Sequence, residues 1–219
     1  MPDLGEIQAK IEKINLVTSE NYNPFRYEER PDLYYQRIQG ELQSLQDILN
    51  TYDLGIKKLD RIECYDISNT SGKQAVGSMV VLLNGETANK EYRRFKIRTK
   101  DTPDDFHMMK EVLSRRIKNT QWDFPDLFVI DGGKGQVGSV LPILRRNGIM
   151  TPVIGLAKRE EIIVLPVETE RNRFEFVEIK LPKSTPGINI LRKIRDEAHR
   201  FAITYHRNLR KKKMMELLA

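Results

Sequence analysis

The sequence contains very little cysteine. Cys64 is the only one among 219 residues, which excludes a disulfide within the chain and is typical of a reducing compartment. There is also no cluster of His and Cys at zinc-ligand spacing, no signal peptide and no apolar run long enough to cross a membrane. We therefore expect a cytoplasmic protein with no membrane partner. Because Cys64 lies inside a strand-like segment, we expect it to pack in the core.

The remaining composition is that of an ordinary globular protein. With 39% hydrophobic and 31% charged residues, the chain is long enough for one substantial core or for a core with an appendage, and one main domain is the economical interpretation. The formal net charge of +6 suggests a polyanionic partner, although a modest excess of Lys and Arg also occurs on proteins that bind none.

The stretch DLFVIDGGKGQV at residues 126–137 is the most informative part of the chain. Leu127–Ile130 is an uninterrupted apolar run with β-branched members, which predicts a strand buried on both faces, and the glycines after it predict a helix start. Asp131 then lies at the mouth of a central strand, where a carboxylate needs a partner such as a metal ion. The glycines let a ligand approach the backbone, and Lys134 indicates that this ligand is anionic.

Other interpretations of this stretch stay open when it is taken alone. Residues 133–138 match the G-x-G-x-x-G pattern of dinucleotide-binding proteins, with Glu160 at the distance of a ribose-binding acid. Against this, Asp131 would put a negative charge beside the pyrophosphate, and no mononucleotide-binding half precedes the unit. A P-loop would need G-K-[ST], which is absent. Asp131 could also simply cap the helix near Lys134.

Hydrophobic periodicity divides the chain into a helical first part and an α/β second part. We expect a short helix at residues 2–16, a linker at 19–30, and a helix at 31–52 that packs on the domain from outside or pairs as a coiled coil. The predicted divisions are an N-terminal helical segment and linker at 1–59, which packs on the domain, and the domain itself at 60–219.

The second part predicts a mixed sheet with helices on its faces. Strand-like segments at 62–67, 76–83 and 92–97 form an antiparallel trio, with Asn84-Gly85 as a hairpin turn. The elements predicted after them are a helix opened by Pro103 and Asp104, the central strand Leu127–Ile130, a helix at 136–147, a buried strand at 153–156, a two-stranded excursion at 162–167 and 174–179, and a long helix after Pro186-Gly187.

A second strand-borne carboxylate is Asp66, which interrupts the first strand segment and is costly if it is buried without a partner. The order of the elements allows the first strand and the central strand to lie side by side, which would bring Asp66 to Asp131. Two such carboxylates facing one cleft make an oxygen-ligand site for a hard cation, for which Mg²⁺ or Mn²⁺ is expected.

The final helix carries one apolar stripe at helical spacing. His199 lies at the edge of the stripe, and Arg192, Arg195 and His206 share that edge. We expect the helix to press its apolar face on the sheet and to show a histidine and arginines at the margin. A histidine at such a boundary is more often structural or exposed than functional.

Several stretches, in order, resemble the C-terminal half of UvrC, the nuclease subunit of bacterial nucleotide excision repair. They are RIECYDISNTSG at 61–72, EYRRFKIR at 91–98, DDFHMMKEVLSRR at 104–116, PDLFVIDGGKGQ at 125–136, VIGLAKREE at 153–161 and IRDEAHRFAITYHR at 194–207. Together they are far more specific than any one glycine pattern. The resemblance implies that 60–219 is an RNase H-like endonuclease domain: a mixed five-stranded sheet flanked by helices, with an extra β-hairpin and a long C-terminal helix.

The resemblance also implies which residues act. The family's nuclease centre uses two aspartates and a histidine, which correspond to Asp66, Asp131 and His199 as catalytic residues and metal ligands. Asp105 corresponds to a further carboxylate associated with activity, although an Asp at a helix start is also favoured as a cap. The implied function is a metal-dependent DNA endonuclease that makes the 5′ incision in excision repair, with a UvrB–DNA complex as partner and a place in the SOS response.

Three parts of the family do not match these residues: the GIY-YIG nuclease domain, the UvrB-interacting motif and the tandem helix-hairpin-helix domain. We therefore expect either a fragment or a reduced homologue. The alternative function is a non-catalytic module of the same fold that binds double-stranded DNA.

Basic residues near the matching motifs are candidates for phosphate contact. They are Arg93, Arg94, Lys134, Lys158, Arg159, Arg192, Arg195 and Arg200. The basic run at 210–213 could continue this track or could be a solvated helix end.

Overall fold

The structure is a computed structural model that describes residues 31–68, 75–98, 104–157, 162–169 and 173–218. For residues 31, 173 and 205–218 it describes the backbone alone. Several expectations lie outside the described residues: the helix at 2–16, the linker at 19–30, and the positions of Pro103, Lys158, Arg159 and Glu160.

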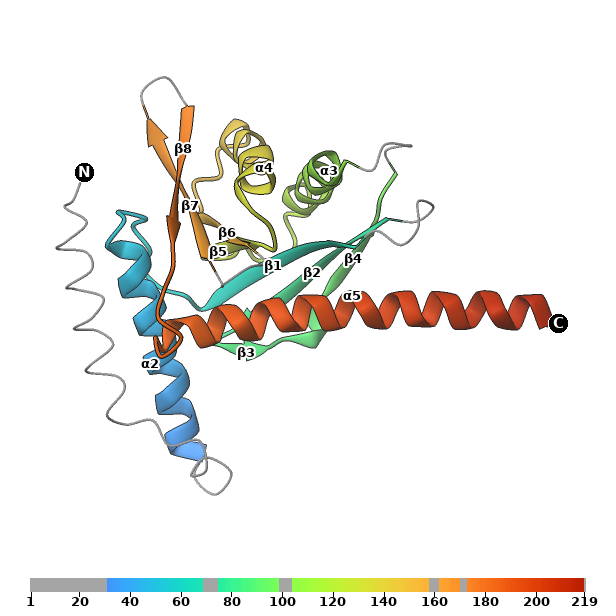
Figure 1. Ribbon diagram of the computed structural model, residues 1–219, viewed down its shortest axis with the longest axis horizontal. Helices are drawn as coiled ribbons and strands as arrows, with labels where there is room; N and C mark the ends of the chain where they lie inside the picture. Colours follow the sequence, from blue (N-terminus) through green and yellow to red (C-terminus); the bar gives the residue numbers. More distant parts are fainter. Residues whose placement is uncertain (1–30, 69–74, 99–103, 158–161, 170–172, 219) are drawn as a thin grey trace.

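The helices and strands of the described chain lie largely where the periodicity predicts (Figure 1). The helices are α2 (Pro31–Asn50), the short 3-10 helix η2 (Asn89–Glu91), α3 (Asp105–Ile117), α4 (Lys134–Arg146) and α5 (Gly187–Leu218). The strands are β1 (Arg61–Ser68), β2 (Val76–Leu83), β3 (Glu86–Thr87), β4 (Arg93–Lys96), β5 (Leu127–Ile130), β6 (Val153–Ala157), β7 (Ile162–Thr169) and β8 (Arg173–Ile179).

All the strands join one mixed sheet in the order β3-β2-β1-β5-β6-β7-β8, with β4 also paired to β2. β1, β2 and β4 form the expected antiparallel trio, and β5 and β6 continue from β1 in parallel. The predicted mixed sheet is thus confirmed, and its five expected strands belong to a sheet of eight that also includes the short, unpredicted β3. The extra hairpin of β7 and β8 is also present, and it extends the sheet because β7 pairs with β6.

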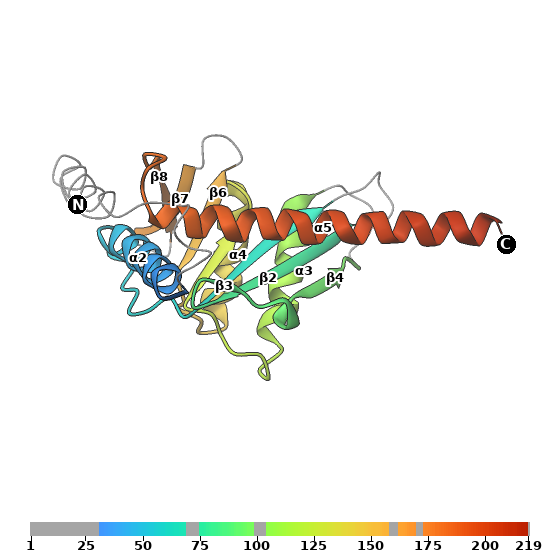
Figure 2. The ribbon, with the colours of Figure 1, turned by 90° about the horizontal axis from the view of Figure 1, so that it is seen from below.

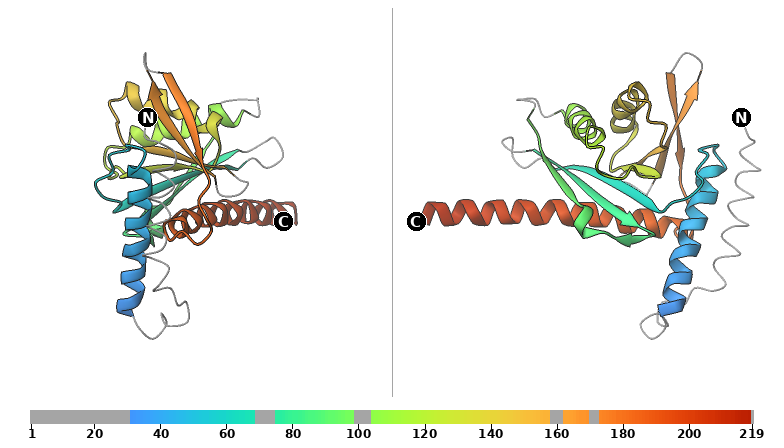
Figure 3. Two further views of the ribbon diagram at one scale, coloured as in Figure 1. Left: turned by 60° about the vertical axis from the view of Figure 1, so that its left-hand side comes forward. Right: turned by 180° about the vertical axis from the view of Figure 1, so that it is seen from behind.

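Helices cover both faces of this sheet. α3 and α4 contact each other on one face, and α5 runs along the other face against β1 and β2 (Figures 1 and 3). α2 packs on α5 and crosses the N-terminal turns of α5 at a steep angle. No helix in the described part of the chain is long and apolar enough to span a membrane.

The central strands are buried because apolar side chains cover both of their faces. All four residues of β5 are buried, and β1 is buried from Arg61 to Asp66. β5 lies between β1 and β6 and pairs in parallel with both, the arrangement in which helices cover both faces of a strand. The residues that follow β5 consequently lie at the carboxyl end of a rigid, central strand.

Asn84 and Gly85 make the predicted tight turn between β2 and β3. Both have positive φ, 49° and 78°, and Leu83 pairs with Glu86 across them, which is the geometry of a two-residue type I′ hairpin. Gly85 is needed for a second reason, because a Cβ on it would lie 2.4 Å from Cγ2 of Ile38. The turn therefore packs directly against α2.

One hydrophobic cluster connects the sheet with α2, α3, α4 and α5. Leu45 of α2 and Ile190 and Ile194 of α5 are buried in it, so the apolar stripe of the final helix faces the sheet as predicted. Cys64 is buried in the same cluster, which confirms its packing role. The division of the chain at residues 59 and 60 stays a prediction.

Candidate active site

Asp66 and Asp131 lie at the carboxyl ends of two adjacent parallel strands. β1 and β5 pair so that Tyr65 is opposite Ile130, and the backbone N–H of Asp131 donates to the carbonyl of Tyr65 at 2.8 Å. The next residues, Asp66 and Asp131, are therefore at the same level of the sheet. The predicted juxtaposition of the first strand and the central strand is confirmed.

A cavity of about 210 Å³ lies at this end of the two strands. Its lining residues come from β1, α3, the loop after β5, the first turn of α4 and the end of β6: Asp66, Ile67, Asp105, Met109, Asp131, Gly132, Gly133, Gln136 and Ala157. Three of them are carboxylates from three different elements. Carboxylate oxygens gathered at one cavity are the ligand type that Mg²⁺ and Mn²⁺ prefer.

Negative charge is concentrated at the end of β1. Asp66 is only 6% exposed and accepts a hydrogen bond from Ser68 Oγ at 3.0 Å. Burial raises the pKa of the Cys64 thiol well above its ordinary value, the charges of Asp131 and Asp66 raise it further, and Arg195 acts in the opposite direction. Asp66, Asp131 and the Arg195 cation of α5 are thus all close enough to Cys64 to act on its thiol.

The cap of α3 is Asp104, and this corrects the suggestion that Asp105 caps the helix. Asp104 has an extended backbone, and its Oδ1 accepts hydrogen bonds from the N–H groups of Phe106 at 2.9 Å and His107 at 3.3 Å. The side chain of His107 also hydrogen-bonds to Asp104, which lowers the pKa of the Asp104 carboxyl. Asp105 is already the first helical residue, so its carboxylate lines the cavity without serving as the cap.

The glycine-rich loop brings the start of α4 to the cavity. Gly133 is the N-cap residue, and its N–H donates to Oε1 of Gln136 at 3.1 Å. Because a helix N-terminus carries partial positive charge and N–H groups without helical partners, this edge of the cavity suits an anion such as a phosphate. Lys134 adds a cation there, held by Glu178 at 3.1 Å in a pair whose two side chains are about half exposed.

His199 lies on α5, which runs along the face of the sheet opposite α3 and α4 (Figure 2). Its side chain is exposed and is not among those that line the cavity. In the described ranges, no three His, Cys, Asp or Glu side chains are close enough together to hold a metal ion. The structure thus brings Asp66, Asp105 and Asp131 to one cavity, and the role of His199 stays a prediction.

Comparison with known proteins identifies the family. The model of the UvrC RNase H endonuclease domain matches residues 51–203, which is most of the chain. The chain belongs to this family. Its membership, together with the order of the sheet, confirms the RNase H-like fold that the sequence motifs imply.

Curated relatives carry the same family name. The domain is 41% identical over 203 residues to UvrABC system protein C of Fusobacterium nucleatum subsp. nucleatum, covering 87% of this chain and 33% of that protein. It is 42% identical over 193 residues to UvrABC system protein C of Dictyoglomus thermophilum, covering 84% and 30%. The chain therefore spans about a third of the length of these relatives.

Two solved structures show a distant likeness to this chain. Endonuclease V of Bacillus subtilis is 13% identical, covers 68% of this chain and 82% of its own, and has a TM-score of 0.38. Endonuclease V of Ciona intestinalis in complex with DNA containing an inosine is 17% identical, with coverages of 58% and 69% and a TM-score of 0.38.

The basic residues proposed for phosphate contact lie on several elements of this UvrC domain. Arg93 places its guanidinium 4.8 Å from the centroid of the Trp122 ring, whereas Arg94 lies 3.9 Å from that of Phe201 on α5. Arg192, Arg195 and Arg200 all belong to α5, where Arg200 Nε donates to Glu197 at 2.7 Å. Arg94 and the α5 arginines thus share the α5 side of the sheet. Lys158 and Arg159 lie outside the described residues.

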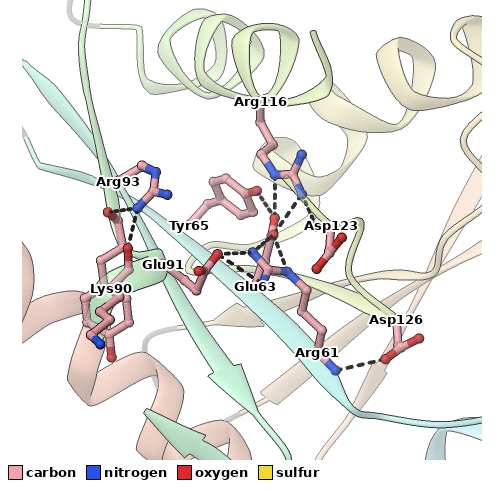
Figure 4. A network of polar contacts seen from close by, with 10 residues as sticks. Arg61, Glu63, Tyr65, Lys90, Glu91, Arg93, Arg116, Asp123 and Asp126 are labelled. Carbon is pink, nitrogen blue, oxygen red and sulfur yellow. Dashed lines mark hydrogen bonds and ion pairs between the residues drawn. The ribbon is translucent and has the colours of Figure 1, made fainter. Parts of the chain in front are cut away.

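A buried ionic network holds β1 against α3 in the UvrC domain (Figure 4). The carboxylate of Glu63, which is fully buried, accepts hydrogen bonds from Arg116 Nε and Nη2, both at 2.9 Å, and from Arg61 Nε at 3.0 Å. Arg116 Nη2 also donates to the carbonyl of Asp123 at 2.6 Å, and the Tyr65 hydroxyl donates to Glu63. Glu63 precedes Asp66 by three residues and Arg116 lies on the helix that carries Asp105, so the network fixes the two elements relative to each other.

Gly155 of β6 lies beside the cavity, because the glycine-rich loop before α4 passes close to it. A Cβ at this position would lie 2.6 Å from the carbonyl oxygen of Gly132 and 2.7 Å from Cγ2 of Val137. We expect Gly155→Ala to lower the free energy of unfolding by about 1–3 kcal/mol, the usual range for overpacking, and to weaken nicking, because Gly132 lines the cavity. Urea denaturation and a plasmid-nicking assay measure the two effects.

The matched control for this prediction is Gly40→Ala. Gly40 lies in α2 with nothing within 4 Å of the added Cβ, so alanine should stabilise the helix by about 0.5–1 kcal/mol and leave nicking unchanged. A Gly155→Ala variant as stable and active as the Gly40→Ala variant would contradict the close approach of β6 to Gly132.

Two cavity residues that sequence reasoning did not single out are Gln136 and Met109. Gln136 could have been found, because Gln three residues after an N-cap is the signature of a side chain that returns to the cap. Met109 gives no such signal, since a methionine on the apolar face of a helix reads as core filling.

Proposed function

We propose that this UvrC RNase H domain is a divalent-metal-dependent DNA endonuclease that makes the incision 5′ to a lesion in nucleotide excision repair. The observation that supports the proposal best is the meeting of Asp66, Asp105 and Asp131 at one cavity beside the start of α4. Carboxylates that could hold cations, beside a helix N-terminus that could receive an anion, suit metal-assisted phosphodiester hydrolysis.

The donor set fits Mg²⁺ or Mn²⁺ as the cofactor. Mg²⁺ is commonly held by only one or two carboxylates, with water and substrate phosphate oxygens completing its shell. Asp66 and Asp131 at adjacent strand ends would therefore be enough as protein ligands, even though no three ligand-type side chains among the described residues are close enough together to hold an ion by themselves. When bound, such an ion would activate water and stabilise the charge that develops on the phosphate.

The chain's own groups would position the substrate. N–H groups in the first turn of α4 would orient a phosphate oxygen, and Lys134 could exchange its exposed partner Glu178 for a phosphate at little energetic cost. Asp105, on a different helix from these groups, would orient water or a second cation. His199 is proposed to complete a metal shell or to transfer a proton.

The proposed partners are double-stranded DNA and a UvrB–DNA complex. The arginines of β4 and α5 would contact phosphates, which carry no sequence information. Because the chain spans about a third of its curated relatives, lesion recognition is proposed to come from UvrB and from the rest of a full-length protein.

A plasmid-nicking assay tests the proposed function. We expect relaxation of supercoiled DNA with Mn²⁺ or Mg²⁺, none with EDTA, and recovery when the metal is restored. DNA binding without nicking under any metal would instead support a non-catalytic DNA-binding module. Saturable binding of NAD or NADP would revive the dinucleotide interpretation, which three carboxylates at the cavity disfavour.

DNA binding should weaken steeply with salt and should be nearly indifferent to sequence, because neutralised phosphates release counterions. We expect Arg195→Gln to reduce the slope of log affinity against log salt by about 1, the value for one phosphate contact. Lys118→Gln, at the end of α3 remote from the cavity, is the control. Fluorescence anisotropy with unrelated duplexes measures the slopes, and equal slopes for the two variants would argue against a phosphate contact by Arg195.

A further inference from the structure

Phe106 is an exposed aromatic residue at the rim of the carboxylate cavity. Its side chain is 44% exposed, although it stands in the first turn of α3, directly after Asp105, which lines the cavity. Other large apolar side chains of the described chain are also exposed: Tyr35, Leu83, Phe124, Met150 and Ile203. None of these adjoins a cavity-lining residue in sequence, whereas Phe106 does.

The ring of Phe106 lies against the first turn of α4, close to Gly135. A Cβ on Gly135 would lie 2.5 Å from Cε1 and 2.6 Å from Cζ of the ring. The ring edge therefore lies between the starts of α3 and α4, while much of the side chain remains exposed. The apolar residues that pack α3 onto the core are others, namely Met108, Met109, Val112 and Leu113.

We propose that Phe106 stacks on the base of a nucleotide that flanks the phosphate held at the carboxylate cavity. Every base has a π-face, so an exposed ring beside a phosphate site is a stacking platform that tolerates any sequence. Phe106 directly follows Asp105 at the start of α3, and consecutive Cα atoms are about 3.8 Å apart. A phosphate beside Asp105 and a base on Phe106 would thus belong to the same or neighbouring nucleotides.

The ligand of this stacking position is an unstacked base, from a single strand or from a locally opened duplex. A base inside an intact helix has both faces covered by its neighbours, so it is not available to the ring. This inference rests on the proposed function, since it takes the cavity as the phosphate site. It adds that the nuclease selects DNA that is already opened next to the cleaved bond.

The test is a double-mutant cycle that combines removal of the Phe106 ring with removal of one base, and it measures DNA affinity instead of cleavage. In an Asp131→Asn background, affinity is measured for a single strand in which one abasic nucleotide is moved along the sequence. We expect one position to lower the affinity about 5- to 100-fold, the usual worth of one stacked base. In Phe106→Leu, which keeps an apolar contact with Gly135 but has no ring, the abasic nucleotide at that position should have no further effect.

Two controls separate stacking from helix packing. Phe106→Tyr should retain the full abasic effect, and Phe124→Leu, the same chemical change at a residue 41% exposed beyond the far end of α3, should retain it too. An abasic effect that is equal in Phe106→Leu and the parent, or that is absent at every position, would overturn the stacking proposal. A positive cycle in a chain whose parent never nicks would instead leave stacking intact and refute the nuclease proposal.

Discussion

Replacing either Asp66 or Asp131 by Asn is expected to abolish metal-dependent nicking while the fold and the DNA affinity survive. Each substitution keeps the size of the side chain and removes one charge from the strand end where the two residues meet. Replacing a residue that only hydrogen-bonds to a metal ligand usually lowers metal affinity or activity about 10–100-fold. Replacing a proposed ligand itself should therefore lower the nicking rate by more than about 100-fold. Rates of plasmid relaxation at several Mn²⁺ concentrations give the measurement, with circular dichroism to check the fold.

The control for these variants is Asp196→Asn. Asp196 is exposed on α5 and is not among the cavity-lining residues, so its variant should nick at the parent rate. Raised Mn²⁺ should partly restore the Asp66 and Asp131 variants if the lost charge held a cation. Nicking at the parent rate by either variant would remove the carboxylate cavity as the site of cleavage.

The structure also sharpens what is expected of Asp105. Because Asp104 supplies the cap of α3, Asp105→Asn should lower nicking without lowering stability. Asp104→Ala should do the reverse and lower stability first, because the N–H groups of Phe106 and His107 lose their acceptor. The pKa of Asp104 is lowered in the folded state. Its contribution to the stability of the fold is therefore complete above the ordinary carboxyl pKa, and it is lost as the pH falls through the pKa of the folded protein.

Much of the fold could be predicted from the sequence because local patterns and strand order agree. The apolar run Leu127–Ile130 predicts a strand covered on both faces, and Asn84-Gly85 predicts a two-residue hairpin, as found. The meeting of Asp66 with Asp131 follows from the order of strands, since one antiparallel trio followed by a crossover leaves β1 open to pair with β5.

The finer parts of the site depend on contacts that no periodicity encodes. Asp104 and Asp105 are equally good cap residues, and only the extended backbone of Asp104 decides between them. The spacing along α5 predicts that His199 lies at the edge of the apolar stripe, but it gives no distance to the strand ends. Gly155 reads as one more residue of a buried strand, whereas its role is set by the Gly132 carbonyl across the loop.

Glu63→Gln is expected to cause a large loss of stability. Glu63 and Arg116 have side chains with no exposed surface, and that of Arg61 is 8% exposed. Burial alone would lower the pKa of Arg116, but the hydrogen bonds and charge of Glu63 raise it above its ordinary value. Removing the carboxylate charge leaves two guanidinium groups buried together, and breaking a buried pair in this way costs about 3–5 kcal/mol.

Glu91→Gln is the matched control, because Glu91 contacts the same Arg61 at 3.4 Å through a side chain that is 35% exposed. A pair at that exposure is worth about 1 kcal/mol or less. Urea denaturation of the parent and both variants at neutral pH compares the free energies of unfolding. Equal losses in the two variants would mean that Glu63 does not anchor β1. If only Glu63→Gln lowers the free energy of unfolding strongly, the ion pairs of Glu63 with Arg61 and Arg116 stabilise β1, the strand that carries Asp66.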